Sequence, residues 1–254
     1  KNNPKDAEAY YSRGIAKGKS RNYSGELDDY NMAIEINPTL AEPYHNRGVL
    51  KRDLGDLAGA LADFTIAIKI YARRGFRKGK SGDYSGAISD FTKVIEINPS
   101  DSDTYIRRGL IKGRSGDDSG AIADFTKAIE INPSDSNAYG SRGVAKASSG
   151  DNSGAISDYT KAIEINPSDG MIYYGRGRLK SDLGDFSGAL ADFSKAIEIN
   201  PSDAYAYFNR GATKYNLKDY SGAIADYTKA IEINPSHTNA YFNRGATKYD
   251  LKDY

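Results

Sequence analysis

Residues 102–135 read SDTYIRRGLIKGRSGDDSGAIADFTKAIEINPSD, and this stretch decides the fold. Its apolar and small residues recur at three- and four-residue spacing, which is the period of a helix with one buried face. Gly116-Asp117 interrupts the pattern, because glycine ends a helix and aspartate caps the free amide groups of the next. Asn132-Pro133 ends the second segment, since proline lacks an amide hydrogen and disfavours helix in the residue before it. The stretch therefore predicts two antiparallel amphipathic helices.

The same pattern recurs along the chain. Asn-Pro pairs end at Pro4 and Pro38, and from Pro99 to Pro235 they recur every 34 residues. A fixed period of this length is typical of a solenoid, in which each unit packs on its neighbours. We therefore expect an all-α, right-handed α-solenoid of stacked antiparallel helix hairpins. The expected units are 7–40, 41–70, 71–101, 102–135, 136–169, 170–203 and 204–237, followed by 238–254 as the first helix of a further repeat or a capping helix.

The recurring columns resemble the tetratricopeptide repeat (TPR) family. Tyr105 stands early in the first helix and Gly109 follows, while Ala121, Phe125 and Ala128 match the small-large-small seam of the family's second helix. The resemblance covers nearly the whole chain and implies a TPR superhelix. An arginine before the glycine and a lysine three residues after it depart from the family's usual residues. We interpret the chain as a bacterial-type array with an Arg-Gly/Lys variant of the first helix.

One unit is too short. Pro38 and Pro99 are 61 residues apart, seven fewer than two repeats, and the shortfall lies between Ile70 and Tyr71, where an Asn-Pro turn is expected. Either the turn is deleted and two helices run together, or a disordered loop belongs here and is absent from the sequence. Junctions in foldable sequences usually agree with their neighbours, which favours the missing loop.

Every first helix carries an arginine, and in the seven complete hairpins an aspartate of the second helix stands opposite it, as Asp124 stands opposite Arg108 in the stretch quoted above. A catalytic interpretation would require paired acids in a cleft with separated pKa values. A residue repeated in every unit has a structural role instead. We therefore predict that Arg108 and Asp124 form a structural ion pair, with the arginine stem lying along the core.

Composition argues against several functional classes. With 35 basic and 34 acidic residues, the chain has no global field that would attract nucleic acid or an anionic membrane. No apolar run approaches the roughly 20 residues that span a bilayer, so direct membrane insertion is not expected. Gly79-Lys80-Ser81 resembles the end of a phosphate-binding loop, but its glycine spacing is wrong and the segment is predicted to be helical. His45 and His237 stand far apart, so we expect no catalytic residue, metal or cofactor.

In the TPR family the first helices line a concave groove, so their variable residues are the candidate ligand-binding residues. In the carboxy-terminal half these are aromatic and amide side chains, which suit interface anchors: Tyr174, Tyr205, Phe208, Asn209, Tyr215, Phe242, Asn243 and Tyr249. In the amino-terminal half they form a basic strip that suits an acidic partner: Lys19, Arg52, Lys80, Arg107 and Arg114. Alternatively, the aromatic set covers the next repeat or an end of the array.

These features predict a non-catalytic protein-protein interaction scaffold that binds a peptide or protein segment in the concave groove. The alternatives are a self-associating scaffold and a TPR segment of a larger multidomain protein. The expected partner is another protein or a peptide, and self-association remains open. Both ends cut into a repeat, so we expect a fragment without its targeting signal. The compartment is therefore open, with the cytoplasm as the default.

Overall fold

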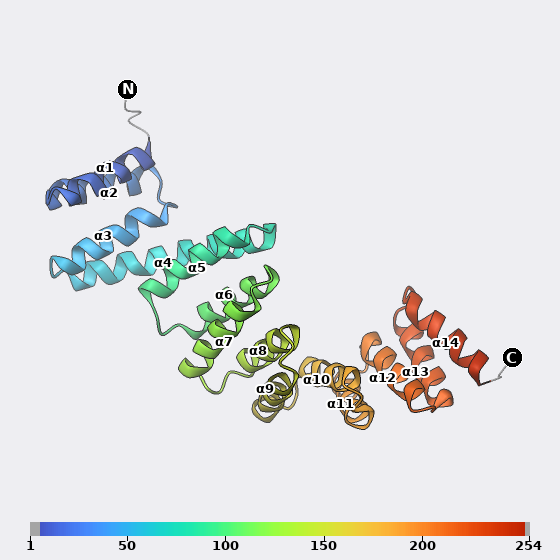
Figure 1. Ribbon diagram of the computed structural model, residues 1–254. Coiled ribbons are helices and arrows are strands. Elements are labelled where there is room, and N and C mark those ends of the chain that lie inside the picture. Colours follow the sequence, from blue (N-terminus) through green and yellow to red (C-terminus); the bar gives the residue numbers. More distant parts are fainter. Residues whose placement is uncertain (1–5, 252–254) are drawn as a thin grey trace. The chain divides into compact units, whose positions relative to one another are not determined.

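The computed structural model describes residues 6–251, which form fourteen α-helices (Figure 1). They pack as antiparallel hairpins, which confirms the predicted all-α architecture. Residues 1–5, with Pro4, and residues 252–254 of the last expected unit lie outside the described part. The helices are α1 (Ala7–Lys19), α2 (Tyr23–Ile36), α3 (Ala41–Asp53), α4 (Leu57–Ser81), α5 (Tyr84–Ile97), α6 (Ser102–Arg114), α7 (Asp118–Ile131), α8 (Ser136–Ser148), α9 (Asn152–Ile165), α10 (Gly170–Asp182), α11 (Phe186–Ile199), α12 (Ala204–Asn216), α13 (Tyr220–Ile233) and α14 (Thr238–Asp250).

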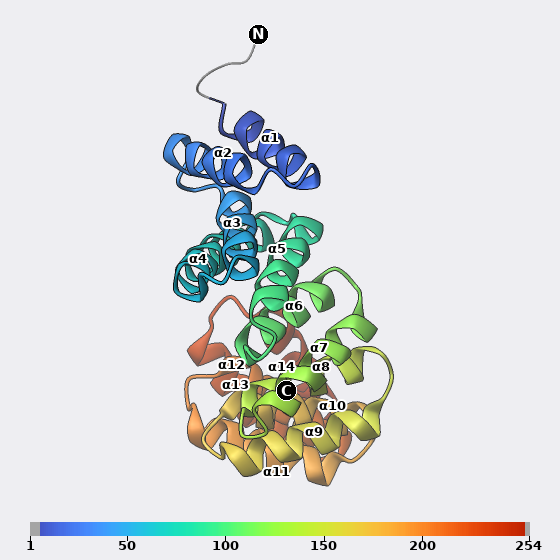
Figure 2. The same cartoon turned by 90° about the vertical axis from the view of Figure 1, so that its left-hand side faces the viewer.

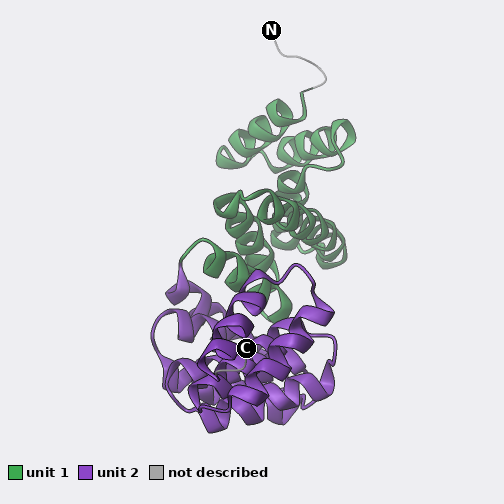
Figure 3. Ribbon diagram, turned by 90° about the vertical axis from the view of Figure 1, so that its right-hand side faces the viewer, with its two compact units in different colours: residues 1–116 green, residues 117–254 purple. Residues whose placement is uncertain are grey.

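The chain divides into two compact units, residues 1–116 and 117–254 (Figure 3). In the first unit α1 packs on α2, and α4 packs on both α3 and α5. Figure 2 shows α1 and α2 side by side from a second direction. In the second unit the hairpins are α8 with α9, α10 with α11, and α12 with α13, and each second helix also contacts the following first helix. Each hairpin thus stacks on the next within its unit.

The turns follow from their residues. Gly150 lies in the turn between α8 and α9 and has a left-handed conformation with φ +89°, which glycine adopts without strain. Asp151 caps α9 by accepting the Gly154 amide at 2.9 Å, and a Cβ on Gly154 would lie 2.1 Å from an Asp151 carboxylate oxygen. At the other end Asn166 is the C-cap, directly before Pro167. The predicted helix starts and stops are therefore confirmed in this hairpin.

Small residues let the paired helices approach closely. Tyr159 of α9 is 5% exposed and lies between the fully buried Ala155 and Ala162. The facing residue on α8 is Gly143, where a Cβ would lie only 2.9 Å from the Tyr159 ring. This is the small-large-small seam that the sequence predicted.

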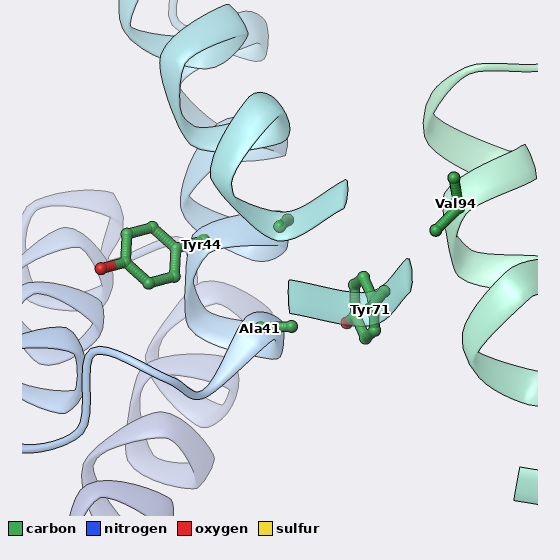
Figure 4. Packing of buried hydrophobic residues seen from close by; sticks show 5 residues of the cluster. Ala41, Tyr44, Tyr71 and Val94 are labelled. Carbon is green, nitrogen blue, oxygen red and sulfur yellow. The ribbon is translucent and has the colours of Figure 1, made fainter. Parts of the chain in front are cut away.

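Helix α4 corrects the interpretation that was favoured for the short unit. It runs unbroken through Ile70 and Tyr71 over 25 residues, so no loop separates the two helices that the sequence predicted. Two facts explain the error: the segment carries no proline, and its buried Ala67 and Tyr71 lie one turn apart on a single face. Figure 4 shows Tyr71 with Ala41 and Tyr44 of α3 and Val94 of α5, all in one buried cluster.

Buried carboxylates tie the hairpins together. Asp158 of α9 is 4% exposed, accepts two hydrogen bonds from Arg142 of α8 at 2.8 and 2.7 Å, and forms a salt bridge with Lys146 at 2.9 Å. Arg142 also donates to Thr126 of α7 at 3.1 Å, and its guanidinium carbon lies 5.6 Å from the Tyr139 ring centroid. One arginine therefore connects three successive helices.

The same bidentate contact recurs in five other pairs: Arg13–Asp29, Arg47–Asp63, Arg74–Asp90, Arg176–Asp192 and Arg210–Asp226. The lysine that shares each aspartate is a contact that the sequence analysis missed. Arg108 and Asp124 lie in different units, and their pairing stays a prediction. Within its own unit Arg108 donates to Thr92 at 2.9 Å.

The seven-residue shortfall within α4 changes the partners of one arginine. Most of these arginines donate to a polar side chain sixteen residues earlier, as Arg142 does to Thr126. Sixteen residues before Arg74 stands Ala58, which has no acceptor. Arg74 donates instead to Glu42 at 2.7 Å, so the network closes through a different residue.

We expect the first unit to lose stability in acid. The hydrogen bond from Arg13 lowers the pKa of Asp29; burial opposes a low pKa for Asp63, but hydrogen bonds from Arg47 and Lys51 outweigh it. A lowered folded-state pKa contributes stability that is present above the unfolded value of about 4 and is lost as pH falls through the folded value. Urea denaturation of wild type and Asp63→Asn should therefore show a stability difference that shrinks from pH 7 to pH 3. A constant difference would contradict the prediction.

Candidate functional site

Three hollows occupy equivalent places between successive first helices. They lie between α1 and α3 (about 460 Å³), between α8 and α10 (about 350 Å³), and between α12 and α14 (about 320 Å³). The floor of each is a tyrosine of the intervening second helix, namely Tyr30, Tyr159 or Tyr227. The other four repeats have phenylalanine in that column. We refer to these sites as the α1–α3, α8–α10 and α12–α14 hollows.

The α12–α14 hollow has aromatic walls. Tyr215 of α12 and Phe242 of α14 line it together with Asn243 and the floor residue Tyr227. Burial raises the pKa of Tyr227 to about 12, so its hydroxyl stays protonated near neutral pH. Phe242 is 74% exposed. The hollow thus combines an accessible aromatic ring with polar groups at its base.

Three of the eight predicted aromatic-face residues, Tyr215, Phe242 and Asn243, come together in this hollow. Tyr215 also donates to Asp250 at 2.7 Å. Tyr249 lies on the same helix as Phe242 and is 69% exposed, but it does not line the hollow.

Other predicted aromatics pack inside the array. The Phe208 ring lies 5.7 Å from Tyr227 and 4.8 Å from His237, and Tyr205 lies 5.2 Å from His237. His237 is buried, caps α14 and has an Nε2 without a hydrogen-bond partner. Phe208 therefore supports α14 more than it faces solvent.

Tyr174 and Asn209 join neighbouring repeats. The Asn209 side chain donates to the Tyr174 hydroxyl at 3.1 Å and to the Tyr205 carbonyl at 2.8 Å. The Tyr174 ring packs 5.9 Å from Phe193 and lines the α8–α10 hollow. These two residues hold α10 against α12.

The predicted basic strip is spread over four helices: Lys19 on α1, Arg52 on α3, Lys80 on α4, and Arg107 and Arg114 on α6. Lys19 lines the α1–α3 hollow. Arg52 forms a salt bridge with Asp53 at 3.0 Å, and the Lys80 ammonium lies 4.7 Å from the Phe76 ring centroid. The structure does not bring the five cations into one site.

The α8–α10 hollow contains residues that sequence reasoning missed. Arg178, Asp182 and Met171 of α10 line it with Ser148 of α8 and Tyr159. The signal was present, because the position of Arg178 is apolar in every other repeat: Ile15, Val49, Phe76, Leu110, Val144, Ala212 and Ala246. Its charge makes Arg178 a candidate binding residue.

Residues 6–251 contain no cluster of three or more histidine, aspartate or glutamate side chains that could hold a metal ion. Across the same residues, no helix is both long and apolar enough to cross a membrane.

Comparisons with known protein families all identify the same kind of repeat. Sequence models described as tetratricopeptide repeat match residues 68–101, 102–135, 136–169 and 204–237, and one described as TPR repeat matches residues 177–218. Together they cover more than half of the 254 residues. No curated protein sequence matches the chain.

Solved structures share the fold. The chain is 25% identical to MamA, with a TM-score of 0.60 over 68% of this chain and 94% of that one. It is 21% identical to YrrB, described as a TPR protein with an unusual peptide-binding site, with a TM-score of 0.56 over 85% and 97%. Yeast Tom70 is 20% identical, with a TM-score of 0.63 over 97% of this chain and 54% of that one.

Proposed function

We propose that this chain, which belongs to the tetratricopeptide repeat family, is a non-catalytic scaffold that binds a peptide segment of another protein along its first helices. Proteins of this family generally bind other proteins. In this proposal the arginines and lysines that recur in the first helices define a variant of the repeat. Their role is structural, because they form salt bridges with the buried aspartates.

The α12–α14 hollow carries the proposal. An aromatic ring that is 74% exposed beside a hollow of about 320 Å³ is a favourable binding anchor, because a partner side chain can bury it at small entropic cost. The buried Tyr227 hydroxyl and Asn243 at the base supply polar groups that orient the bound segment. We place the anchor of the partner segment here, with Phe242 and Tyr215 on either side.

We expect Phe242→Ala to weaken peptide binding about tenfold or more, because truncation of an interface aromatic costs at least ~1–2 kcal/mol. The probe is a peptide selected from a random library displayed on phage, with its Kd measured by fluorescence polarisation. Leu61→Ala is the matched control, since Leu61 is 68% exposed on α4 in the other unit. Equal Kd values for all three proteins, or a library that yields no binder, would count against the proposal.

Self-association is a second candidate, and the exposed face of α14 favours it. Tyr241 is 46% exposed and Phe242 is 74% exposed on this helix. A molar mass that rises with concentration in light scattering, and that Phe242→Ala returns to the monomer value, would support this candidate.

A further inference from the structure

The α8–α10 hollow differs from the α12–α14 hollow in what lines it. Ala147, Ser148 and Gly175 stand where the other hollow has Tyr215, Asn216 and Asn243. These small residues leave the floor accessible, and a Cβ on Gly175 would lie 3.6 Å from the Tyr159 hydroxyl oxygen. The two hollows therefore suit different side chains of a partner.

The polar neighbours of Tyr159 differ from those of the other floor tyrosines. Tyr30 donates to Glu26 at 2.9 Å, and Tyr227 shares its hollow with the Asn243 side chain. In the α8–α10 hollow the corresponding residues are Ala155 and Gly175, which carry no polar side chain. Burial raises the pKa of Tyr159, so its hydroxyl stays protonated and is a donor near neutral pH. The small lining residues leave this hydroxyl open to the hollow, where it can donate to an acceptor supplied by a ligand.

Arg178 supplies a positive charge at the same place. It is exposed and forms no salt bridge within residues 6–251. The arginines of the buried column differ from it, since each described pair satisfies its guanidinium with an aspartate. The charge of Arg178 is therefore available to an anion in the hollow, and a guanidinium matches the planar geometry of a carboxylate.

We infer that the α8–α10 hollow binds an acidic side chain of the partner segment, with Arg178 as the cation and the hydroxyls of Tyr159 and Ser148 as donors. This inference rests on the proposed function, because the same segment places its anchor in the α12–α14 hollow. Asp182 lines the rim and repels anions, so it favours a singly charged carboxylate over a doubly charged phosphate.

The two hollows set the spacing of the partner's side chains. They lie two repeats apart within the second unit. Successive first helices lie side by side, at the separation of about 10 Å that is usual for packed helices. Two such steps, from α8 to α10 and from α10 to α12, separate the hollows by about 20 Å. An extended chain advances about 3.3 Å per residue, and the acidic and aromatic side chains are therefore about six residues apart.

The test uses synthetic peptides in a Gly/Ser background that carry one Phe and one Glu, two to nine residues apart and in both orders. Matched peptides replace Glu with Gln or phosphoserine, or Phe with Ser. Binding to the full chain is measured by fluorescence polarisation up to millimolar protein. The best Glu peptide, with a separation near six, is expected to bind about tenfold more tightly than its Gln match, since hydrogen bonds to a charged group are the stronger kind.

The variants use residues that this chain carries at the equivalent position of another repeat, so they fit the fold. Arg178→Val follows Val144, Tyr159→Phe follows Phe193, and Asp182→Asn follows Asn216. Arg178→Val should abolish the preference for Glu over Gln, and Tyr159→Phe should reduce it severalfold. Asp182→Asn should increase affinity for the Glu peptide, because a repulsive charge is removed.

Equal binding of Glu and Gln peptides, a preference that survives Arg178→Val, or tighter binding of phosphoserine would overturn the acidic-side-chain site. In each case a retained preference for Phe over Ser that Phe242→Ala removes would leave the proposed function standing. If no peptide binds wild type at millimolar concentration, both the site and the proposed function fail.

Discussion

Asp158→Ala is expected to lower the free energy of unfolding of the second unit by about 3–5 kcal/mol, the usual cost of removing one partner of a buried ion pair. The variant leaves Arg142 and Lys146 with charges that face a buried cavity, and it removes two hydrogen bonds at 2.8 and 2.7 Å. Thr126 still accepts from Arg142, but a single hydroxyl does not neutralise the guanidinium. The loss should therefore exceed that of an ordinary surface substitution several times over.

Urea denaturation followed by circular dichroism gives the change, and hydrogen exchange measured by mass spectrometry locates it to α7 through α10. Glu164→Ala is the matched control, because Glu164 pairs with Lys161 on the exposed side of the same helix α9. We expect that control to leave the unfolding midpoint unchanged. If Asp158→Ala costs no more than Glu164→Ala, the buried network does not hold the hairpins together.

A double-mutant cycle separates the pair from its surroundings. Arg142→Leu alone leaves the Asp158 charge buried with only Lys146, whereas Arg142→Leu with Asp158→Leu removes both charges. Because replacing a buried ion pair with apolar residues is often neutral, the double variant should be more stable than either single variant. Additive losses would show that the two residues act independently.

Ile70→Pro is expected to lower the free energy of unfolding by about 3 kcal/mol or more, because proline in a helix interior removes a hydrogen bond and clashes with the carbonyl four residues earlier. The position lies in the middle of α4, at the point where the repeat pattern predicts a turn. The same substitution would be harmless if a loop occupied this junction. The effect therefore distinguishes the continuous helix from the loop.

Ser102→Pro provides the control, since Ser102 is the first residue of α6 and proline is tolerated at that position of a helix. Both variants lie in the first unit, so one set of thermal denaturation curves compares them. An unfolding temperature for Ile70→Pro that equals that of Ser102→Pro would contradict the unbroken α4.

The sequence predicts the regular parts of this fold because each turn is decided locally. Gly150 with Asp151, and Asn166 before Pro167, place helix ends from the properties of single residues. The junction at Ile70 was misjudged because the repeat period suggested a turn, whereas the local residues are all compatible with helix. Where period and local preference disagree, the continuous buried face at Ala67 and Tyr71 decides.

The candidate site was harder to predict, because exposure depends on neighbouring repeats. Phe208 and Phe242 occupy the same column, yet Phe208 packs against His237 and Tyr227 while Phe242 is mostly exposed. Their equivalent positions in the repeat predict the same exposure for both side chains. Arg178 differs from its equivalents in the sequence itself, because the other repeats carry an apolar residue at that position. Its place in a hollow depends on the packing of α8 and α10, which the sequence does not show.

The arginine network also bears on how the copy number of repeats can change. Arg142 reaches Thr126 and Asp158, each sixteen residues away. If a whole 34-residue unit such as 136–169 were lost, Thr126 would stand sixteen residues before Arg176, in the place of Thr160. Loss of this 34-residue unit thus leaves Arg176 with an acceptor of the same kind. A shift by any other length, as in α4, requires a substitute such as Glu42, so in-frame duplication is the least disruptive route to a longer or shorter array.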